Sequence, residues 1–520
     1  MLFNSAVFLL GFLPAARACV AFAARRGGPA AGAWVLIVAS LVFYGAWNPA
    51  FLVLLGASIG GNYALARAIL ACEGRTRAQT ALLCAAIAGD LGALAYYKYL
   101  ADLVGFLHLH GLADAAMARP ALPLGISFFT FTQLGYLIDC RAGTVRERGL
   151  RGYLLFATFF PHLIAGPILH HREIMPQFAA AGTWRVSARN IAIGASIFTI
   201  GLLKKTLLAD PLAPVVAAGF GHAQGLAMLG AWRAACGYSL QLYFDFSGYS
   251  DMAIGLARMF NLRFPLNFDS PYKAASVIEY WQRWHMTLTR YLTLYLFNPL
   301  ALRAARARAG RGRAVGRAGQ ATAGGFAAMV AIPIGITMTL AGIWHGSGLT
   351  FVVFGALHAA YLIANHAWRV FGPRQGARGG APGRVQGRAT RVGWIALTYL
   401  AVLVGAVVFR APSLGVAGQM LGGMAGLHGV GIPAGLSARG LLRGARTVGW
   451  FAALYAIVWG APNTQQIMRA VGPALDPVRA GPWPWLVWRP SLPWALAIGG
   501  AAALGLLSLG GTSEFLYFRF

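Results

Sequence analysis

The sequence predicts an all-α, polytopic integral membrane protein with roughly 11–13 transmembrane helices. Hydrophobic residues make up 58% of its 520 residues and charged residues only 11%, whereas about a quarter of a soluble domain is charged. Apolar runs of about 20 residues, the length a helix needs to cross the hydrocarbon of a bilayer, recur from end to end of the chain. Alternating segments of about ten residues, which an outer-membrane barrel would show, are absent from the sequence.

The candidate spans are separated in many places by short Arg-rich segments. In chain order the candidate spans are residues 2–22, 32–47, 51–70, 81–100, 122–138, 153–169, 191–208, 322–344, 350–368, 392–409, 448–459 and 492–509. Pro161, Gly166 and Pro167 mark a break near the end of the sixth of them, because proline and glycine interrupt regular helices.

The formal net charge of +29 would suggest nucleic-acid binding in a soluble chain. Here the arginines collect in short loops between apolar runs, which is the positive-inside pattern of membrane proteins. The first span is followed by Arg25 and Arg26, and its opening residues carry no Lys or Arg. This asymmetry predicts an extracytoplasmic N-terminus and disfavours a cleavable signal peptide, which needs a basic start. Two further basic loops, residues 303–317 and 374–391, are expected to be cytoplasmic.

Acidic residues are unevenly distributed. Eight of the fourteen lie between Asp139 and Glu279, and none lies between Tyr280 and Leu475. A histidine in the acid-free stretch, His345, therefore has no carboxylate nearby in sequence. Any acidic partner of His345 must come from another helix, and the candidates are Asp245, Asp251, Asp269 and Glu279.

The segment around His345 lies between the two basic loops. If both loops are cytoplasmic, the chain between them crosses the membrane an even number of times, which fits two helices flanking Trp344–Gly348. His345 is then at the turn of a hairpin or at a break within the membrane. Gly346-Ser347-Gly348 is a poor helix interior, and irregular backbone at membrane depth is tolerated only beside protein or a water-filled cavity. We therefore expect His345 to line a cavity.

A second histidine, His285, lies in tryptophan-rich sequence. The spacing of Trp281, Trp284, His285 and Leu288 predicts that they share one helix face. His285 either has a functional role there or belongs to an interfacial aromatic belt and hydrogen-bonds a neighbouring backbone group. Upstream, residues 243–251 are rich in carboxylates and hydroxyls, which indicates either a polar passage or an extramembrane loop. Its polar side chains are those of Asp245, Ser247, Tyr249, Ser250 and Asp251.

The other histidines and the cysteines indicate no metal site. His170 and His171 are adjacent, so on a helix they would point about 100° apart and form a poor ligand pair. We interpret them as a solvated helix end, and His358 as a packing residue. The five cysteines lack metal or disulfide spacing.

Several long motifs together resemble the membrane-bound O-acyltransferase (MBOAT) family, and within it the bacterial branch of alginate O-acetylation and teichoic-acid D-alanylation proteins. They are LPLGISFFTF at 122–131, FFPHLIAGP at 159–167, GLLKK at 201–205 with Ala209-Asp210, YSLQLYFDFSGYSDMAIG at 238–255, NFDSPYK at 267–273, EYWQRWHMTL at 279–288 and Trp344-His345-Gly346. One stretch departs from the branch: residues 290–300 lack its usual Arg-Asp-Tyr and Pro-Leu-Gly-Gly.

The resemblance implies a catalytic core over residues 1–370, with C-terminal transmembrane helices, residues 371–520, continuous with it. It also implies helices around a central tunnel or funnel, His345 as the active-site histidine and His285 as a second tunnel histidine. Residues expected to support the tunnel or substrate are Trp344, Asp245, Ser247, Tyr249, Asp251 and Trp284.

The chemistry expected from these residues is acyl transfer to a hydroxyl. A neutral His345 would act as general base on an alcohol that attacks an acyl thioester such as acetyl-CoA, with no covalently bound cofactor. The acceptor would be an extracytoplasmic polysaccharide such as alginate, and an SGNH-type acetyltransferase or a polysaccharide-modification complex would be the partner at the bacterial inner membrane. The alternatives are an acyl-group conduit or transporter that feeds a separate transferase, and a structural subunit of a polysaccharide-export machine.

Overall fold

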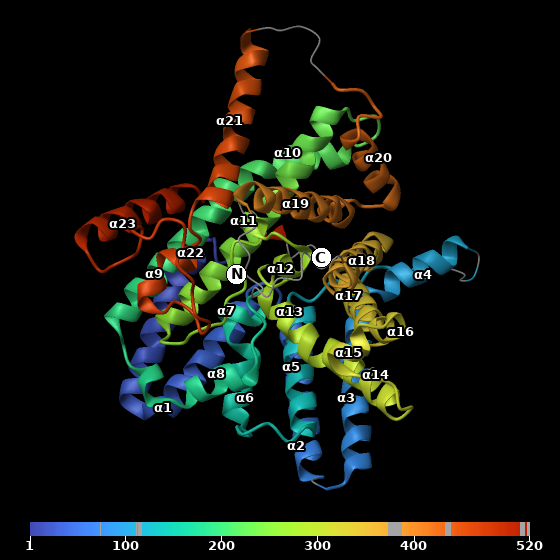
Figure 1. The fold of residues 1–520 in the computed structure, drawn as a ribbon. Coiled ribbons are helices and arrows are strands. Elements are labelled where there is room, and N and C mark those ends of the chain that lie inside the picture. The colour runs from blue at the N-terminus through green and yellow to red at the C-terminus, as the bar shows by residue number, and fades with distance from the viewer. Residues whose placement is uncertain are drawn as a thin grey trace. The chain divides into compact units, whose positions relative to one another are not determined.

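The computed structural model describes residues 1–72, 74–110, 112, 117–372, 387–431, 438–509 and 515–516 (Figure 1). Every regular element in these ranges is helical, which confirms the all-α class. Seven helical stretches of the described chain are long and apolar enough to cross a membrane. They are Val7–Gly45, Phe51–Ala71, Thr76–Lys98, Ala188–Gly221, Ala323–His345, Leu349–Phe371 and Arg388–Arg410.

This number is smaller than the predicted 11–13 because several apolar segments fold as shorter or merged helices. The first two predicted spans form one helical stretch, in which Gly28 alone has a non-helical backbone with φ 73°. The segment 122–138 becomes α5 (Ile126–Arg141), which has only 16 residues. The last segment becomes α23 (Leu492–Leu507), also of 16 residues.

The predicted span at 153–169 is wrong. The chain forms α6 (Leu150–Thr158), leaves the helical conformation at Phe159, and forms the single turn α7 (Phe160–Leu163). A proline, Pro161, stands in the first turn of α7, where its missing N–H leaves no helical hydrogen bond unmade. The break that Pro161, Gly166 and Pro167 indicate is therefore strong enough to end the helix.

The described residues fall into two compact units. Unit 1 consists of Met1–Leu207, Phe244–Leu266 and Thr464–Phe520, and unit 2 of Leu208–Tyr243 and Asn267–Asn463. The long helix α11 (Met228–Met259) begins in unit 2 and ends in unit 1. The predicted division at residue 370 and the predicted tunnel stay predictions.

In unit 1 the helices α2, α3 and α5 contact one another (Figure 1). Besides α5, α6, α7 and α23 the helices of unit 1 are α1 (Leu13–Gly45), α2 (Phe51–Ala71), α3 (Thr76–Lys98), α4 (Leu100–Leu109), α8 (His171–Ala179), α9 (Ala188–Leu203) and α22 (Thr464–Ile467). The π-helical turn η3 (Lys204–Ala209) continues α9.

Glycines bring α9 close to α11. A Cβ atom on Gly194 would lie 2.4 Å from the Gly255 carbonyl oxygen, and one on Gly201 would lie 2.6 Å from that of Gly248. Only residues without side chains allow this approach, which is common between membrane helices. The segment 243–251 is therefore part of a packed helix, and the interpretation as an extramembrane loop is wrong.

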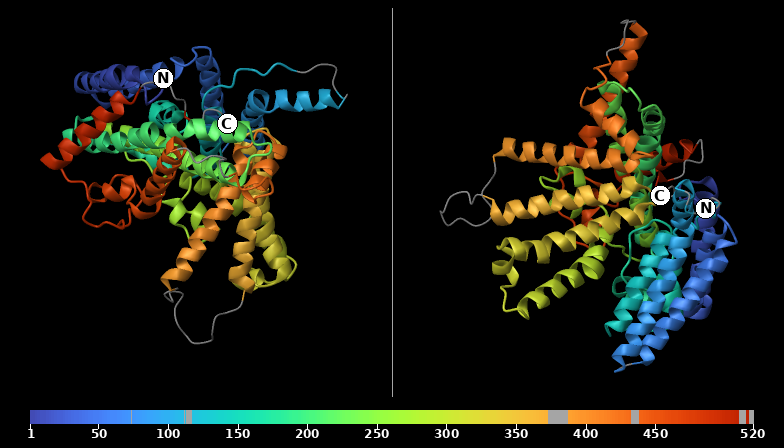
Figure 2. Two further views of the ribbon diagram at one scale, coloured as in Figure 1. Left: turned by 90° about the horizontal axis from the view of Figure 1, so that it is seen from above. Right: turned by 90° about the vertical axis from the view of Figure 1, so that its right-hand side faces the viewer.

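Unit 2 contains a row of contacting helices, α17, α18 and α19 (Figure 2). Its helices are α10 (Ala213–Gly221), α12 (Val277–Trp281), α13 (Met286–Leu292), α14 (Asn298–Ala309), α15 (Gly316–Gln320), α16 (Ala323–Phe326), α17 (Ile332–His345), α18 (Leu349–Phe371), α19 (Arg388–Arg410), α20 (Leu414–Met424) and α21 (Ala438–Gly460).

The hairpin predicted around His345 is confirmed, because α17 ends at His345 and α18 begins at Leu349. Glycines again set the spacing of the two helices. A Cβ atom on Gly342 would lie 2.2 Å from the Phe351 carbonyl oxygen, and one on Gly355 would lie 2.4 Å from that of Met338. The close approach fixes the end of α17, where His345 stands.

Candidate active site

His345 is the last residue of α17 and is buried, with 8% of its surface exposed. Its ring lies among aromatic side chains of unit 2. The ring centroids of Trp344, Phe409 and Phe354 are 4.9, 5.2 and 6.3 Å from that of His345. These contacts place the imidazole beside the rings of Trp344, Phe354 and Phe409. The hydrated cavity beside His345 stays a prediction.

Of the four carboxylates considered as partners of His345, the two on α11 form ion pairs with consecutive lysines. Asp245 Oδ1 lies 2.7 Å from Lys205 Nζ, and both side chains are only 2% exposed. Asp251 Oδ2 lies 2.6 Å from Lys204 Nζ, and the same carboxylate accepts hydrogen bonds from Thr464 and Gln465. Both aspartates therefore serve at least as structural ion-pair partners within unit 1.

The other two carboxylates also have partners of their own. Asp269 Oδ1 accepts a hydrogen bond from Asn463 Nδ2 at 3.0 Å. Glu279 pairs with Arg283 at 2.7 Å and accepts the backbone N–H of Ala275 at 2.8 Å. These contacts fix the loop before α12 and hold its first turn.

His285 does not share a helix face with Trp281 and Trp284, and that prediction is wrong. Helix α12 ends at Trp281, and His285 stands before α13 in the left-handed region, with φ 44° and ψ 52°. Such a backbone costs about 1–2 kcal/mol for a residue with a side chain, and outliers of this kind cluster at functional sites.

The helix is interrupted by Asn267, a residue far away in sequence. Its backbone carbonyl accepts the N–H of Met286 at 2.9 Å. Its side-chain Oδ1 accepts from His285 Nδ1 at 3.0 Å and from Thr287 Oγ1 at 2.9 Å. These bonds replace the helical ones that a continuous helix would make.

The same contact determines the tautomer of His285. An amide oxygen only accepts, so Nδ1 of His285 carries the proton and Nε2 holds the lone pair in the neutral ring. Burial lowers the pKa of His285 to about 3, because a low-dielectric surrounding disfavours the charged form. His285 can therefore accept a hydrogen bond or a proton at Nε2, and it is neutral at ordinary pH.

Aromatic rings surround this turn. Trp284 lies nearly parallel to Tyr280 and Tyr272, with ring centroids 5.7 and 6.2 Å away. Trp281 Nε1 donates to His358 Nδ1 at 3.2 Å, which confirms that His358 is a satisfied packing histidine. The bond from Trp281 to His358 connects α12 with α18, just before the turn that carries His285.

The remaining predicted residues, Ser247 and Tyr249, lie on α11 in unit 1. Both are buried, and the ring of Tyr249 packs on Phe3 and Phe515 at 4.9 and 4.6 Å. The Ser247 hydroxyl has no hydrogen-bond partner among the residues that the structure describes. The structure thus groups Asp245, Ser247, Tyr249 and Asp251 within unit 1, and His285, Trp284, Trp344 and His345 within unit 2.

His170 and His171 stand at a helix end, as predicted, because α8 begins at His171. The predicted solvation is wrong for His171, which is only 3% exposed, and the prediction that the two rings diverge is also wrong. His170 precedes α8 with an extended backbone, φ −97° and ψ 135°, so the two rings do not follow helical geometry. Both Nε2 atoms approach Asp139 Oδ2, at 2.8 and 2.9 Å. This cluster of potential metal ligands is the one found in the described ranges.

Hydrogen bonding argues against a metal at this cluster. His170 Nδ1 accepts the backbone N–H of Arg172 at 3.3 Å, so the proton of the neutral ring is on Nε2, facing Asp139. A metal-bound Nε2 would need that proton on Nδ1 instead. The arrangement fits a carboxylate held by two imidazole N–H groups.

Sequence reasoning missed three functional-looking residues: Asn267, Lys204 and Lys205. All three stand in motifs that carry the family resemblance, at 201–205 and 267–273. Those motifs marked them as distinctive, but their roles depend on partners 18 to 47 residues away.

Comparisons with known proteins identify the family. The family model "MBOAT, membrane-bound O-acyltransferase family" matches residues 126–314. The peptidoglycan O-acetyltransferase of Helicobacter pylori is 34% identical over 467 residues, which cover 83% of this chain and 81% of the relative. A Pseudomonas aeruginosa protein named "Probable alginate O-acetylase AlgI" is 35% identical over 431 residues, covering 81% and 74%. The teichoic acid D-alanyltransferase of Streptococcus thermophilus is 27% identical over 252 residues, covering 47% and 57%. The chain therefore belongs to the membrane-bound O-acyltransferase family and is a multi-pass membrane O-acyltransferase.

Proposed function

We propose that this O-acyltransferase transfers acetyl groups to hydroxyls of an extracytoplasmic polysaccharide. The observation that carries the proposal is the similarity to two relatives named for polysaccharide O-acetylation, 34% and 35% identical over more than four fifths of this chain. The relative named for D-alanyl transfer matches less than half of the chain, at 27% identity. Acetyl is therefore favoured over D-alanyl.

The acceptor is proposed at the level of chemical class, a sugar hydroxyl of the cell envelope. The relatives named for peptidoglycan and for alginate are similar to this chain to nearly the same degree. Alginate is the first acceptor to test and peptidoglycan the second.

In the proposed mechanism His345 is the general base. It takes the proton of the acceptor hydroxyl as the oxygen attacks the thioester carbonyl, and the C–S bond breaks as the thiolate leaves and gains a proton. Positioned proton transfer of this kind contributes about 10²–10⁴-fold to a rate. The position of His345 at the end of a glycine-packed hairpin supports the role, since a base must be held in place.

His285 is proposed to orient the acceptor through Nε2. Its Nδ1 proton is held by Asn267, so Nε2 can accept a hydrogen bond from a sugar hydroxyl. This would align the hydroxyl without removing its proton, and it makes His285 a substrate-binding partner of His345.

The donor is proposed to be acetyl-CoA, used from the cytoplasmic side of a bacterial inner membrane, with an SGNH-type acetyltransferase as extracytoplasmic partner. The clusters of arginine at 303–317 and 374–391 support a cytoplasmic face there.

Reconstitution tests the proposal. The purified protein is placed in sealed vesicles that contain alginate oligosaccharides, and acetyl-labelled acetyl-CoA is added outside. An O-acetyl ester on the oligosaccharide inside supports the proposal. Label that stays on the donor in the presence of alginate and peptidoglycan fragments alike would refute it, and label that crosses without ester formation would establish the conduit.

A further inference from the structure

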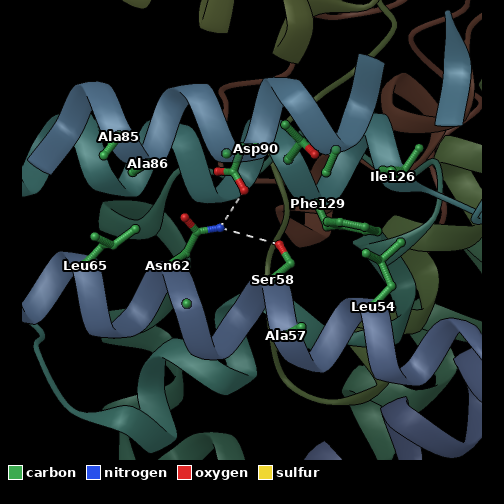
Figure 3. A pocket seen from close by; sticks show the side chains of 14 residues that line it. Leu54, Ala57, Ser58, Asn62, Leu65, Ala85, Ala86, Asp90, Ile126 and Phe129 are labelled. Atoms are coloured by element: carbon green, nitrogen blue, oxygen red, sulfur yellow. Dashed lines mark hydrogen bonds between the residues drawn. The ribbon is translucent and has the colours of Figure 1, made fainter. Parts of the chain in front are cut away.

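Three helices of unit 1, α2, α3 and α5, enclose a pocket that the acyl-transfer chemistry does not use (Figure 3). Its volume is about 230 Å³. Small residues with exposed positions border it on α2 and α3: Ala57, Gly61, Ala85 and Gly89. The pocket therefore opens between these two helices through an apolar mouth.

The polar end of the pocket holds a buried carboxylate, Asp90 of α3, of which 8% is exposed. Figure 3 shows Asp90 facing Asn62 across the pocket. The Nδ2 group of Asn62 donates to Asp90 Oδ1 at 2.8 Å and to Ser58 Oγ at 3.4 Å. Both protons of the Asn62 amide are thereby used, and Ser58 also accepts a bond from Gln133 at 2.8 Å.

The second carboxylate oxygen of Asp90 has no such partner. In the ranges that the structure describes, Oδ2 makes no hydrogen bond and Asp90 forms no ion pair. Asp90 is eight residues from the end of α3 at Lys98, which places it about 12 Å inside the helix. A charged carboxylate at that depth is costly unless a cation pairs with it or a proton neutralises it.

We propose that this pocket binds a ligand that carries a protonated amine on an apolar chain. The ammonium group would donate to Asp90 Oδ2 and neutralise the carboxylate. The chain would lie between α2 and α3, where Gly61 and Gly89 have no side chains and leave open space. A divalent metal ion fits less well, because it takes six or more oxygen ligands and the side chains here offer those of Ser58, Asp90 and Thr130 besides the amide of Asn62.

Chemical protection tests the proposal on the full-length protein in nanodiscs. Dicyclohexylcarbodiimide is an apolar reagent that activates buried carboxyl groups. Mass spectrometry follows the loss of unmodified Asp90, so that an amide formed between the activated carboxyl and an amine is also counted as modification. Dodecylamine at ten times its Kd should slow this modification about tenfold, whereas dodecanol, with the same chain and no charge, should not. Equal protection by dodecanol, or none by dodecylamine, would overturn the proposal.

Lipid composition separates the two sources of an ammonium group. Nanodiscs of phosphatidylcholine alone are compared with nanodiscs that also contain phosphatidylethanolamine. Protection by phosphatidylethanolamine would support the proposal with a lipid headgroup as ligand. Protection by dodecylamine alone would support it with a free amphiphile.

Two variants and a matched control separate binding from folding. Dodecylamine should raise the Tm of the wild type and should not raise that of Asp90→Asn. In Gly61→Leu the Asp90 carboxylate remains, but the new side chain fills the mouth of the pocket. Dodecylamine should therefore not raise the Tm of this variant either. Gly60→Leu makes the same change one residue away, outside the pocket lining, and a Cβ there meets open space as it does at position 61. The proposal would be contradicted if dodecylamine still raised the Tm of Asp90→Asn, or if it failed to raise the Tm of Gly60→Leu.

Discussion

At the scale of single residues, Asn267 determines what His285 can do. Its side-chain oxygen accepts from His285 Nδ1 and Thr287 Oγ1 at 3.0 and 2.9 Å. This contact stabilises a left-handed backbone at His285 and selects the tautomer with its lone pair on Nε2. An asparagine outside the predicted site is therefore part of the histidine's chemistry.

Replacement of Asn267 tests this link. We expect Asn267→Ala to lower the free energy of unfolding by about 1–3 kcal/mol, since a buried donor is left without its acceptor, and to lower acyl transfer with it. Asn267→Asp keeps an acceptor oxygen and should retain more activity. Denaturation and kcat/KM of both variants are the measurements, and equal activity of the alanine and aspartate variants would contradict the tautomer argument.

The low pKa of His285 predicts a pH dependence of stability. The ring binds a proton near pH 6.5 when unfolded and near pH 3 when folded. The unfolded state therefore binds more protons between these values, and stability is lost as pH falls through this range. Between pH 6.5 and pH 4 the Tm of the wild type should fall more steeply than that of His285→Gln, whose amide can still donate to Asn267. Equal falls in Tm for the two proteins would contradict the low pKa of His285.

At the scale of elements, the hairpin of α17 and α18 positions His345. Its two helices approach so closely at Gly342 that a Cβ there would lie 2.2 Å from a backbone oxygen. The end of α17 therefore depends on a glycine one turn before the histidine.

A methyl group at that glycine should displace the histidine. We expect Gly342→Ala to destabilise the protein by about 1–3 kcal/mol, as overpacking does, and to reduce acyl transfer. Gly335→Ala is the matched control on α17, because a Cβ there meets open space. Ester formation and Tm of both variants are measured, and equal behaviour would show that the close approach is not needed.

The buried ion pair between η3 and α11 permits a double-mutant cycle. Asp245→Asn leaves the Lys205 ammonium buried without its counter-ion and should cost about 3–5 kcal/mol. Adding Lys205→Met should recover part of that loss, because the unpaired charge is removed. The free energy of unfolding of the two single variants and the double variant is measured by chemical denaturation. If the loss in the double variant equals the sum of the two single losses, the two side chains do not stabilise each other.

The elements show where sequence reasoning succeeds and where it ends. The hairpin was predictable because two arginine-rich loops, if both are cytoplasmic, require an even number of crossings between them. The ion pairs of α11 were not predictable, because the lysines that neutralise Asp245 and Asp251 are 40 and 47 residues upstream. The helix break at His285 was missed because its cause, Asn267, is 18 residues away.

At the scale of the whole molecule, the family motifs carry the functional conclusion. Hydropathy identified a membrane protein, and the histidine motifs with their resemblance indicated an acyltransferase. Local patterns cannot reveal which polar residues neutralise one another, so the lysine partners of Asp245 and Asp251 could not be predicted. The tunnel role of these two aspartates stays a prediction. Composition likewise gave no sign of the Asp90 pocket, which three helices form together.

The most direct test of the central claim is ester formation by His345→Ala, measured with labelled acetyl-CoA and a polysaccharide acceptor. His222→Ala, at an exposed histidine of unit 2, is the control. The proposed mechanism predicts that His345→Ala loses about 10²-fold or more of the rate while its Tm and helical content match those of the control. Turnover by His345→Ala at the rate of the control would contradict a catalytic role for His345.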